Sequence, residues 1–385
     1  MRSRLLAAFS LLGFGLASCG ANHAGENASG PPFALEEVAR FDRPWAMTFD
    51  EATGVLFVTE MQGSIRFLRP DGAIGSVSGV PKVDYGGQGG LGDFKFAPGQ
   101  TSTALDRRIV YLSWAEAGDG DTRGAAVARA NMVCETELAC ELRDLTVIWR
   151  QHPKVSGRGH YSHRLAFSPD GQYLFIASGD RQKMAPAQDL SNTLGAIVRL
   201  LGDGTPAPGN PFADQGAPSD QIWSFGHRNI LGLAFDAQGR LWDLEHGPRG
   251  GDELNLVRKG ANYGWPLVAN GRHYGGAAIP HHNTRPDLAA PAASWNPVIA
   301  PGDMIFYDGA LFPQWRGQAL IAAMSPAALV RVAIDGEVAR EIARHPMAQR
   351  IRSIAQGPDG AIWLLEDGPR SRGGRLLRLT PRAQQ

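Results

Sequence analysis

A short recurring unit constrains the fold of this chain more than any other feature of its sequence. Each copy has a turn with Asp and Gly, a short apolar run, and then a glycine or an acid, which is the pattern of a turn that leads into a β-strand. The copies that begin at Ser168 and Asp236 are 68 residues apart, an interval typical of the blades of a propeller, and the gaps after the first copy and before the last are wider. The copies begin at Asp50 (D-E-A-T-G-V-L-F-V-T-E), Ser168 (S-P-D-G-Q-Y-L-F-I-A-S-G-D), Asp236 (D-A-Q-G-R-L-W-D-L-E) and Gly357 (G-P-D-G-A-I-W-L-L-E-D).

The composition agrees with an all-β fold. The 385 residues include 48 Gly and 26 Pro, too many turn formers for a mainly helical protein, and segments with helical periodicity are few and short. No linker-like break divides residues 40–380. We therefore expect residues 35–385 to form one six-bladed β-propeller, whose loops gather at the mouth of the central channel. A pair of β-sandwiches is the competing architecture.

The charge balance excludes one class of partner. Lys+Arg and Asp+Glu number 38 each, so the chain has no overall electrostatic field that would attract nucleic acid. We expect no nucleic-acid partner.

The N-terminus has the pattern of an export signal. Arg2 and Arg4 precede an apolar run over residues 5–16, which is too short to span a bilayer permanently. The sequence L-A-S-C that ends at Cys19 resembles the bacterial lipobox, although an ordinary signal peptide with a chance cysteine is the alternative. The resemblance implies a signal peptide over residues 1–18, a lipid on Cys19 and a flexible tether over residues 19–34. Gly20, where an Asp would favour the inner membrane, points to an exported outer-membrane lipoprotein on the periplasmic side, in contact with the membrane only through its lipid.

The two remaining cysteines, Cys134 and Cys140, lie six residues apart in C-E-T-E-L-A-C. In an oxidising compartment such a pair most simply forms a small loop-closing disulfide, and no His lies close by in sequence to complete a metal site. We expect a structural disulfide.

A glycine-rich loop, E-H-G-P-R-G-G-D-E-L-N-L over residues 245–256, is the strongest local candidate for a site. Its glycines would let backbone carbonyls approach an ion or cofactor, and Asp252 and Glu253 offer the oxygen ligands that calcium prefers. From composition alone, a glycine-rich turn with solvated acids explains the loop equally well.

Other segments also carry polar groups at the ends of expected strands. Arg350 and Arg352 alternate along a strand, so both face the same way, and no acid in that segment neutralises them. Such a pair can clamp carboxylates, although solvated surface arginines are the more common finding for this motif alone. The other candidates are Gln88 in G-G-Q-G-G-L-G-D, His160 in G-H-Y-S-H-R-L, Asp180 after the next strand, and Arg228 and Asn229 in G-H-R-N-I-L-G.

Together these segments resemble the soluble PQQ-dependent aldose sugar dehydrogenases, the glucose/sorbosone dehydrogenase family of six-bladed propellers. The similarity extends from about residue 43 to residue 379. It is carried, in this order, by R-P-W-A-M, G-Q-G-G-L, H-Y-S-H-R-L, A-Q-D-L, G-H-R-N, E-H-G-P-R-G-G-D-E-L-N, N-Y-G-W-P, W-N-P-V-I-A-P and R-I-R. Each motif is weak alone, but their joint presence in order is specific.

The resemblance implies oxidation of an aldose at C1 to the lactone, with PQQ and Ca²⁺ as cofactors. His160 matches the general base that takes the proton of the anomeric hydroxyl as hydride leaves C1 for the quinone. Asp180 matches the carboxylate that orients this base, and Arg228 matches the arginine beside the reacting quinone carbonyl. The partners implied are an aldose and an electron acceptor that the sequence does not identify.

The resemblance also implies a set of binding residues. Gln88 and Asn229 match polar contacts to cofactor and sugar, and Arg350 and Arg352 match the pair that binds the PQQ carboxylates. The metal ligands implied are the backbone carbonyls of Gly247 and Pro248 for one calcium ion, and Glu253 with the main chain of Tyr263 for a second, structural ion.

The chain departs from the family pattern at two positions. A lysine that often contacts the cofactor is missing, because L-I-A-A-M-S-P-A-A places Pro326 or a neighbour there. His163 replaces a small residue, so the sequence leaves open whether His160 or His163 faces the channel. The long insertions of the glucose-oxidising branch are absent, which points to the shorter aldose branch and to a monomer.

The sequence is compatible with two other functions. A calcium-dependent propeller hydrolase, such as a sugar lactonase, would use a metal-bound water in an acid-rich channel centre. A non-catalytic propeller that binds sugars or a protein would account for the missing lysine.

Overall fold

β-Strands make up most of the regular structure in this computed structural model, which describes residues 30–368 and 373–382. The expected all-β class is confirmed. Among these residues, no helix is long and apolar enough to cross a membrane. The expected signal peptide, the expected lipidation site Cys19 and most of the expected tether lie outside the described residues.

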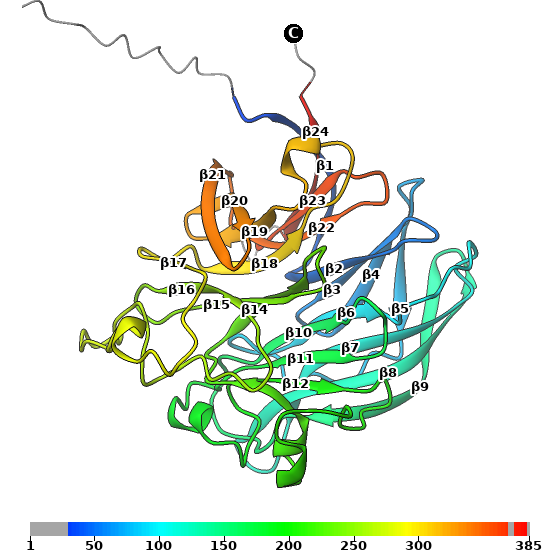
Figure 1. Ribbon diagram of the computed structural model, residues 1–385. Coiled ribbons are helices and arrows are strands. Elements are labelled where there is room, and N and C mark those ends of the chain that lie inside the picture. Colours follow the sequence, from blue (N-terminus) through cyan, green and yellow to red (C-terminus); the bar gives the residue numbers. More distant parts are fainter. Residues whose placement is uncertain (1–29, 369–372, 383–385) are drawn as a thin grey trace, which may run out of the picture. The chain divides into compact units, whose positions relative to one another are not determined.

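Strands that follow one another in sequence are mostly neighbours in the sheets (Figure 1). Four sheets have four antiparallel strands each. One contains β10 (Ser162–Phe167), β11 (Leu174–Ser178), β12 (Ala196–Leu200) and β13 (Ile222–Phe225), and the next β14 (Ile230–Phe235), β15 (Leu241–Glu245), β16 (Asp252–Leu256) and β17 (Ala293–Trp295). The third contains β18 (Pro301–Phe306), β19 (Ala319–Met324), β20 (Ala327–Asp335) and β21 (Val338–Pro346). The fourth contains β22 (Ile351–Gln356), β23 (Ile362–Glu366), β24 (Gly374–Pro381) and the first described strand, β1 (Phe33–Phe41).

The fifth sheet has eight strands in two groups of four. β5 and β9 join the two groups by pairing in parallel, from Ser76 opposite Ala139 to Ser78 opposite Glu141. The first group contains β2 (Pro44–Asp50), β3 (Val55–Glu60), β4 (Ser64–Leu68) and β5 (Ile74–Ser78), and the second β6 (Leu91–Phe96), β7 (Arg107–Ala117), β8 (Arg123–Thr136) and β9 (Ala139–Arg150). Short 3-10 helices lie in the connections at Ala185–Gln188, Ala213–Gln215, Ser219–Gln221, His282–Thr284 and Pro313–Trp315.

The strands β2, β6, β10, β14, β18 and β22 form a closed ring. Each contacts the next in this order, and β22 contacts β2. We call these the inner strands. Sheets arranged radially around such a ring are the architecture of a β-propeller.

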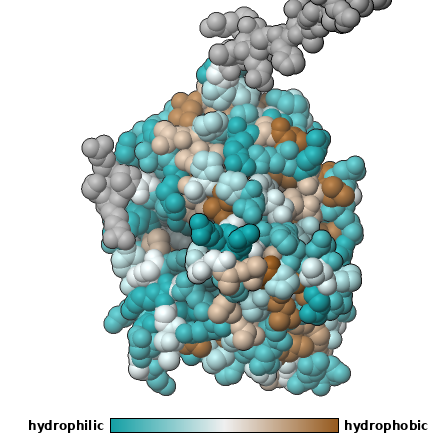
Figure 2. Space-filling model, turned by 90° about the vertical axis from the view of Figure 1, so that its left-hand side faces the viewer, coloured by the Kyte–Doolittle hydropathy of each residue, from teal (hydrophilic) through white to brown (hydrophobic). Residues whose placement is uncertain are grey.

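Apolar side chains fill the spaces between adjoining groups of strands. One cluster joins β1, β22, β23 and β24 to β2, β3 and β4 through residues such as Phe41, Leu56 and Leu376, and other clusters join the remaining neighbours in the same way. Figure 2 shows one outer face, on which hydrophobic residues form small separate groups among hydrophilic ones. The core is therefore distributed between the sheets.

The recurring turn unit of the sequence leads into β3, β11, β15 and β23, as the pattern predicts. Each of these is the strand next to an inner strand in its sheet. Carboxylates shape the turns: Asp236 Oδ1 accepts hydrogen bonds from the backbone N–H of Gln238 and Arg240, and Asp359 Oδ1 accepts one from Ala361. The unit thus marks one equivalent position in four groups of strands.

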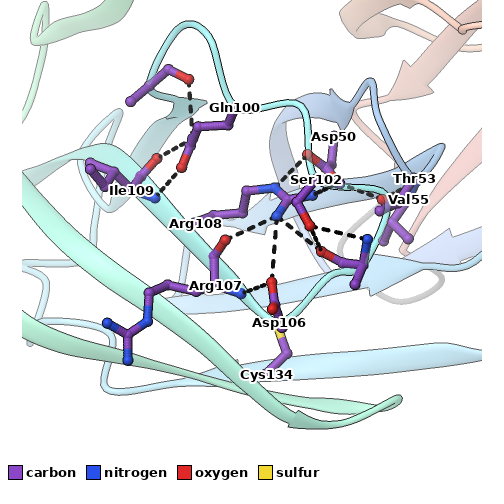
Figure 3. A network of polar contacts seen from close by, with 12 residues as sticks. Asp50, Thr53, Val55, Gln100, Ser102, Asp106, Arg107, Arg108, Ile109 and Cys134 are labelled. Carbon is purple, nitrogen blue, oxygen red and sulfur yellow. Dashed lines mark hydrogen bonds and ion pairs between the residues drawn. The ribbon is translucent and has the colours of Figure 1, made fainter.

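A buried ion pair connects the two halves of the eight-stranded sheet (Figure 3). The guanidinium of Arg108, in β7, donates to both carboxylate oxygens of Asp50, at the end of β2, over 2.9 Å each. Its remaining N–H groups donate to the carbonyls of Ser102, Ala104 and Arg107. A buried charge is tolerated when it is paired and fully hydrogen-bonded, as it is here.

Cys134 in β8 and Cys140 in β9 form a disulfide. The two residues are directly opposite each other in the antiparallel pair, so the bond closes the end of this long hairpin. It lies at the outer side of the eight-stranded sheet, next to the join with β5.

The pairing of β1 with β24 closes the ring between the two ends of the described chain. It extends from Phe33 opposite Pro381 to Phe41 opposite Gly374. Phe33 and Ala34 therefore belong to the propeller, which corrects the expected end of the tether at residue 34. Phe33 is 2% exposed and packs edge-on against Trp315, with ring centroids 6.3 Å apart.

We expect Phe33→Ala to lower the free energy of unfolding by about 3–5 kcal/mol, because it leaves a cavity where the last sheet is completed. Urea unfolding of the full chain measures this value. Leu35→Ala, two residues along the same strand at a position that is 45% exposed, is the control and should change it by less than about 0.5 kcal/mol. Equal effects of the two substitutions would contradict a closing role for Phe33.

Candidate active site

The candidate site lies at one edge of the sheets, where loops from several groups of strands meet. In an antiparallel pair, the start of the first strand and the end of the second lie at the same edge. The residues expected from the sequence occupy these two positions. Gln88, His160, Asn229 and Arg350 lie shortly before inner strands, and Asp180 and Gly247 lie shortly after the strands that follow them.

Every inner strand has a register irregularity at its start. The shifts fall between Pro44 and Ala46 in β2, Leu91 and Phe94 in β6, Ser162 and Leu165 in β10, Ile230 and Gly232 in β14, Pro301 and Asp303 in β18, and Ile351 and Ser353 in β22. A bulge turns a side chain away from the regular alternation of a strand. The first residues of the inner strands can therefore face the central opening.

Two adjoining cavities occupy this edge. The main cavity, of about 510 Å³, is lined by residues from the starts of β2, β6, β10, β14 and β22. The second is lined by the 245–253 loop and by residues near Tyr263. His246 lines both cavities.

His160 and Asp180 form a buried pair. His160 Nδ1 lies 2.6 Å from Asp180 Oδ1, and the other carboxylate oxygen of Asp180 accepts a hydrogen bond of 2.7 Å from the indole N–H of Trp265. The backbone N–H of Gln182 donates to Asp180 Oδ1 as well. The imidazole is thus fixed by a carboxylate that is itself fixed by two further donors.

The electrostatics of the pair define its protonation. Burial lowers the pKa of His160 and nearby Arg228 lowers it further, which outweighs the opposing effect of Asp180. Burial acts to raise the pKa of Asp180, but its bond to His160 holds that pKa below the usual value. His160 is therefore neutral at pH 7, with its proton on Nδ1 facing the carboxylate and a lone pair on Nε2.

Gln88 and Asn229 brace the loop that carries His160. Gln88 Oε1 accepts a hydrogen bond of 2.7 Å from the backbone N–H of His160, and Asn229 Oδ1 accepts one of 3.3 Å from Ser162. His160 and Ser162 have positive φ values of 50° and 65°, which non-glycine residues rarely adopt. Both amide side chains also line the main cavity, so each serves the loop and faces the opening.

Arg228 lies between the two parts of the site. Its backbone N–H donates to Glu245 Oε2 over 2.6 Å and its Nη1 to the carbonyl of His246 over 2.9 Å. The Nε atom of this buried guanidinium has no hydrogen-bond partner among the described residues. The side chain lines the second cavity, and its carbonyl accepts a hydrogen bond from the backbone N–H of Asp180.

Arg350 and Arg352 both line the main cavity, but an acid from another segment pairs with them. Asp367, which follows β23, accepts a hydrogen bond of 3.0 Å from Arg350 Nε and bonds of 3.0 and 2.8 Å from Arg352. The pKa of Asp367 is below its usual value, because the two guanidinium groups outweigh the effect of burial. No acid within their own segment neutralises these arginines, but Asp367 from another segment pairs with both.

The four residues expected to hold metal ions all line the second cavity: Gly247, Pro248, Glu253 and Tyr263. Within the described chain, no residue donates a hydrogen bond to the carbonyl oxygens of Gly247, Pro248 or Tyr263. Glu253 Oε1, in contrast, lies 3.2 Å from His282 Nε2. Three carbonyls are thus available as ligands, while the carboxylate already has a partner.

Asp252 does not supply a ligand oxygen to either cavity, contrary to the expectation from the sequence. Its Oδ1 accepts a hydrogen bond from the backbone N–H of Gly247, and its Oδ2 accepts bonds from Ile299 and Ala300. Burial raises the pKa of Asp252 to about 6. The carboxylate braces the base of the loop.

His163, the other candidate for the base, lines the main cavity but has no carboxylate partner. Its ring stacks on Tyr161 with centroids 5.2 Å apart, and neither ring nitrogen has a hydrogen-bond partner among the described residues. Burial and the charges of Arg181 and Arg164 lower its pKa to about 3. Nothing in this arrangement would stabilise an imidazolium at this position.

Several residues at the site were not identified from the sequence. His246, Asp367, Arg43 and Met324 line the main cavity, with Met324 next to the position of the missing lysine. Tyr274 lies with its hydroxyl 3.5 Å from Arg228 Nη2. A signal existed for two of them, since His246 and Asp367 directly follow strands that the recurring turn unit predicts.

A further buried cluster borders the second cavity. His227 Nδ1 is 3.3 Å from Glu245 Oε1 and 3.4 Å from Asp243 Oδ2, and Asn255 donates to both carboxylates. The three ligand atoms lie within 4.8 Å of one another, a spacing that could hold a metal ion. Burial opposes the charge on His227, but the two carboxylates outweigh it and raise the pKa of the imidazole. Burial raises the pKa of Asp243 well above its usual value, so this acid favours its neutral form. An imidazolium of His227 beside Glu245 and Asp243 accounts for the cluster without an ion.

The protonation of His160 can be tested in solution. We expect its pKa to lie below 6.5 and the neutral ring to carry its proton on Nδ1. Asp180→Asn should lower the pKa further, because Asp180 stabilises the imidazolium. Nitrogen-15 NMR of the two ring nitrogens measures both properties, and a pKa that rises in Asp180→Asn would contradict this account.

Comparisons with known proteins agree with this geometry. The family model described as Glucose / Sorbosone dehydrogenase matches residues 41–378. The chain is 36% identical over 351 residues to "Aldose sugar dehydrogenase YliI" of Escherichia coli (strain K12), covering 89% of this chain and 91% of that protein.

Solved structures show the same fold. The apo-form of the soluble aldose sugar dehydrogenase from Escherichia coli matches with a TM-score of 0.81 at 34% identity, over 91% of this chain and 100% of that one. The PQQ-bound form of aldose sugar dehydrogenase from Streptomyces coelicolor matches with a TM-score of 0.71 at 26% identity, over 91% and 99%. The chain is therefore a β-propeller that belongs to the glucose/sorbosone dehydrogenase family.

Proposed function

We propose that this protein is a PQQ- and calcium-dependent dehydrogenase that oxidises aldose sugars at C1 to the lactone. The observation that carries the proposal is the His160–Asp180 pair, a neutral imidazole oriented by a buried carboxylate. Neither residue lines the two cavities itself, but Tyr161 next to His160 lines the main cavity, and Arg228, whose carbonyl accepts a hydrogen bond from Asp180, lines the second. The likeness to aldose sugar dehydrogenases, one of them PQQ-bound, supports it.

The residues of the site fit PQQ. The buried Nε of Arg228 lacks a partner among the described residues, so it can donate to a ligand. Arg350 and Arg352 present guanidinium groups to the main cavity, and guanidinium groups bind carboxylates well. Asn229 adds an amide at the same cavity.

The second cavity fits a calcium ion. Calcium takes oxygen ligands, which the carbonyls of Gly247, Pro248 and Tyr263 and the carboxylate of Glu253 would provide. The Cβ of any residue other than glycine at position 247 would lie 2.2 Å from the carbonyl oxygen of Gly251, so the loop needs glycine there. PQQ held by these residues would supply a two-electron acceptor for the hydride of C1, and a calcium ion held by the carbonyls of the second cavity would supply Lewis-acid polarisation.

The protein's own residues supply the acid–base chemistry. His160 Nε2 accepts the proton of the anomeric hydroxyl, and the ionised Asp180 stabilises the imidazolium that forms. Arg228 contributes positive charge where negative charge develops. Gln88 holds the backbone of His160 in its left-handed conformation, so the imidazole keeps its direction.

The charge of the main cavity favours this function over the lactonase alternative. Arg43, Arg350 and Arg352 line it, and Asp367 is the one carboxylate that lines it among the residues that the structure describes. A hydrolase that activates a metal-bound water would need acidic ligands at this position.

We further propose that each inner strand begins one blade, which gives six blades, and that the propeller functions as a monomer. The eight-stranded sheet then counts as two blades joined through β5 and β9. We also propose export to the periplasmic side, anchoring to the outer membrane through a lipid on Cys19, and electron transfer to a separate, unidentified acceptor. The pattern of residues 1–19 supports the anchor.

Aldose oxidation by the purified protein should require both PQQ and calcium. Relative to the wild type, His160→Ala should lower kcat about 10²- to 10⁴-fold, the usual contribution of a general base. Dye reduction with a panel of aldoses measures the rate. His345→Ala, at a half-buried histidine outside both cavities, is the control. Activity that survives His160→Ala undiminished would refute the assigned base.

The arginine pair should determine cofactor affinity. We expect Arg352→Ala to raise the Kd for PQQ about 10- to 100-fold, because a charge-assisted hydrogen bond contributes about 1.5–3 kcal/mol. Equilibrium dialysis with PQQ and calcium measures the Kd. Arg344→Ala removes an arginine of the outer strand β21 that pairs with Glu341, and it should leave the Kd unchanged. Equal Kd values for the two variants would place the cofactor elsewhere.

A further inference from the structure

Tyr161 and His163 carry three buried polar atoms that nothing in the described protein satisfies. The Tyr161 hydroxyl and both ring nitrogens of His163 have no hydrogen-bond partner among the described residues. The two side chains are only 1% and 2% exposed. Both line the main cavity.

This arrangement is costly for a protein core. A neutral imidazole always carries one N–H, and a buried donor without a partner loses the hydrogen bonds that water would give it. Other residues of the same loop show no such deficit. His160 bonds to Asp180, and Ser162 Oγ accepts a hydrogen bond from the backbone N–H of Ile230.

The neighbours of the two rings hold them in place. The Tyr161 ring stacks on the nearly parallel ring of His163, and the guanidinium of Arg181 lies over the Tyr161 ring, 3.8 Å from its centroid. The His163 ring also meets Trp45 edge-on, with centroids 5.8 Å apart. Rotation of either ring toward another partner would break this stack.

Two glycines of the G-G-Q-G-G-L-G segment make room for these rings. A Cβ at Gly89 would lie 2.9 Å from Tyr161 Cε2, and a Cβ at Gly92 would lie 2.6 Å from His163 Cβ. Contacts this short do not occur between real side chains. The glycine-rich segment is therefore shaped in part around the unsatisfied pair.

We propose that Tyr161 and His163 form a polar wall of the cofactor cavity and bond directly to the bound quinone cofactor. This inference rests on the proposed function. The cofactor offers oxygen atoms that accept hydrogen bonds from the Tyr161 hydroxyl and from the N–H of His163. Asn229, Arg350 and Arg352 line the same cavity and offer the cofactor an amide and two guanidinium groups. Tyr161 and His163 would add neutral hydrogen-bond donors to these groups.

The proposal predicts opposite effects on stability and affinity. His163→Phe keeps a ring in the stack but removes the unsatisfied nitrogens, and Tyr161→Phe removes only the hydroxyl. Each variant should have a Tm equal to or above that of the wild type, because a buried donor without a partner is gone. Each should raise the Kd for PQQ about 10-fold, because a hydrogen bond to the ligand is gone.

A matched variant separates this effect from general loss of a histidine. His345 also stacks on an aromatic ring, that of Trp315 at 5.8 Å, and its Nε2 also lacks a partner among the described residues. It lies outside both cavities. His345→Phe should therefore leave the Kd unchanged.

Calcium-loaded protein is titrated with PQQ by equilibrium dialysis, and thermal unfolding of the cofactor-free protein is followed in parallel. Weaker binding with unchanged or higher Tm in both cavity variants supports the proposal. Unchanged Kd values, or a lower Tm with wild-type binding, would show that the pair serves only the core. A wild type that fails to bind PQQ would instead overturn the proposed function, and the inference with it.

Discussion

The pairing of β1 with β24 is the constraint on which the rest of the structure depends. It unites the two ends of the described chain in one sheet, so that β22 contacts β2 and the ring of inner strands closes. The cluster that contains Phe41, Leu56 and Leu376 fills the space between the last and first groups of strands. Closure also brings Arg350 and Arg352 to the same cavity as Gln88, residues that are more than two hundred positions apart in sequence.

Local backbone geometry then turns this edge into a site. Each inner strand starts with a register shift, and several residues there adopt positive φ, among them Arg43 at 46°, His160 at 50° and Ala300 at 46°. Such conformations persist only where surrounding contacts hold them. Gln88 and Asn229 provide those contacts for the loop of His160, and Asp252 provides them for the loop that ends at Ala300. Many of the hydrogen bonds made by polar side chains at the site therefore stabilise the conformation of the backbone.

The sequence predicts the fold class and most of the site, but it fails where a long-range contact determines the role of a residue. The turn unit finds β3, β11, β15 and β23 because Asp and Gly shape those turns locally. The equivalent strands β7 and β19 lack that unit, which explains the wide intervals beside them. Asp252 and Asp367 illustrate the limit at the site: which groups donate hydrogen bonds to a carboxylate depends on strands far away in sequence, and no local pattern encodes it.

The two histidines of the same loop show how environment divides their roles. His160 lies against a carboxylate that is held ionised and that would stabilise an imidazolium at this position. Burial of His163 against aromatic rings, together with the charges of two arginines, disfavours any added proton and keeps this imidazole neutral. His160 and His163 are three residues apart but differ in chemistry. His160 contacts Asp180, which follows β11, whereas His163 stacks on Tyr161. In this loop, the position of one carboxylate separates the proposed proton acceptor from an imidazole that stays neutral.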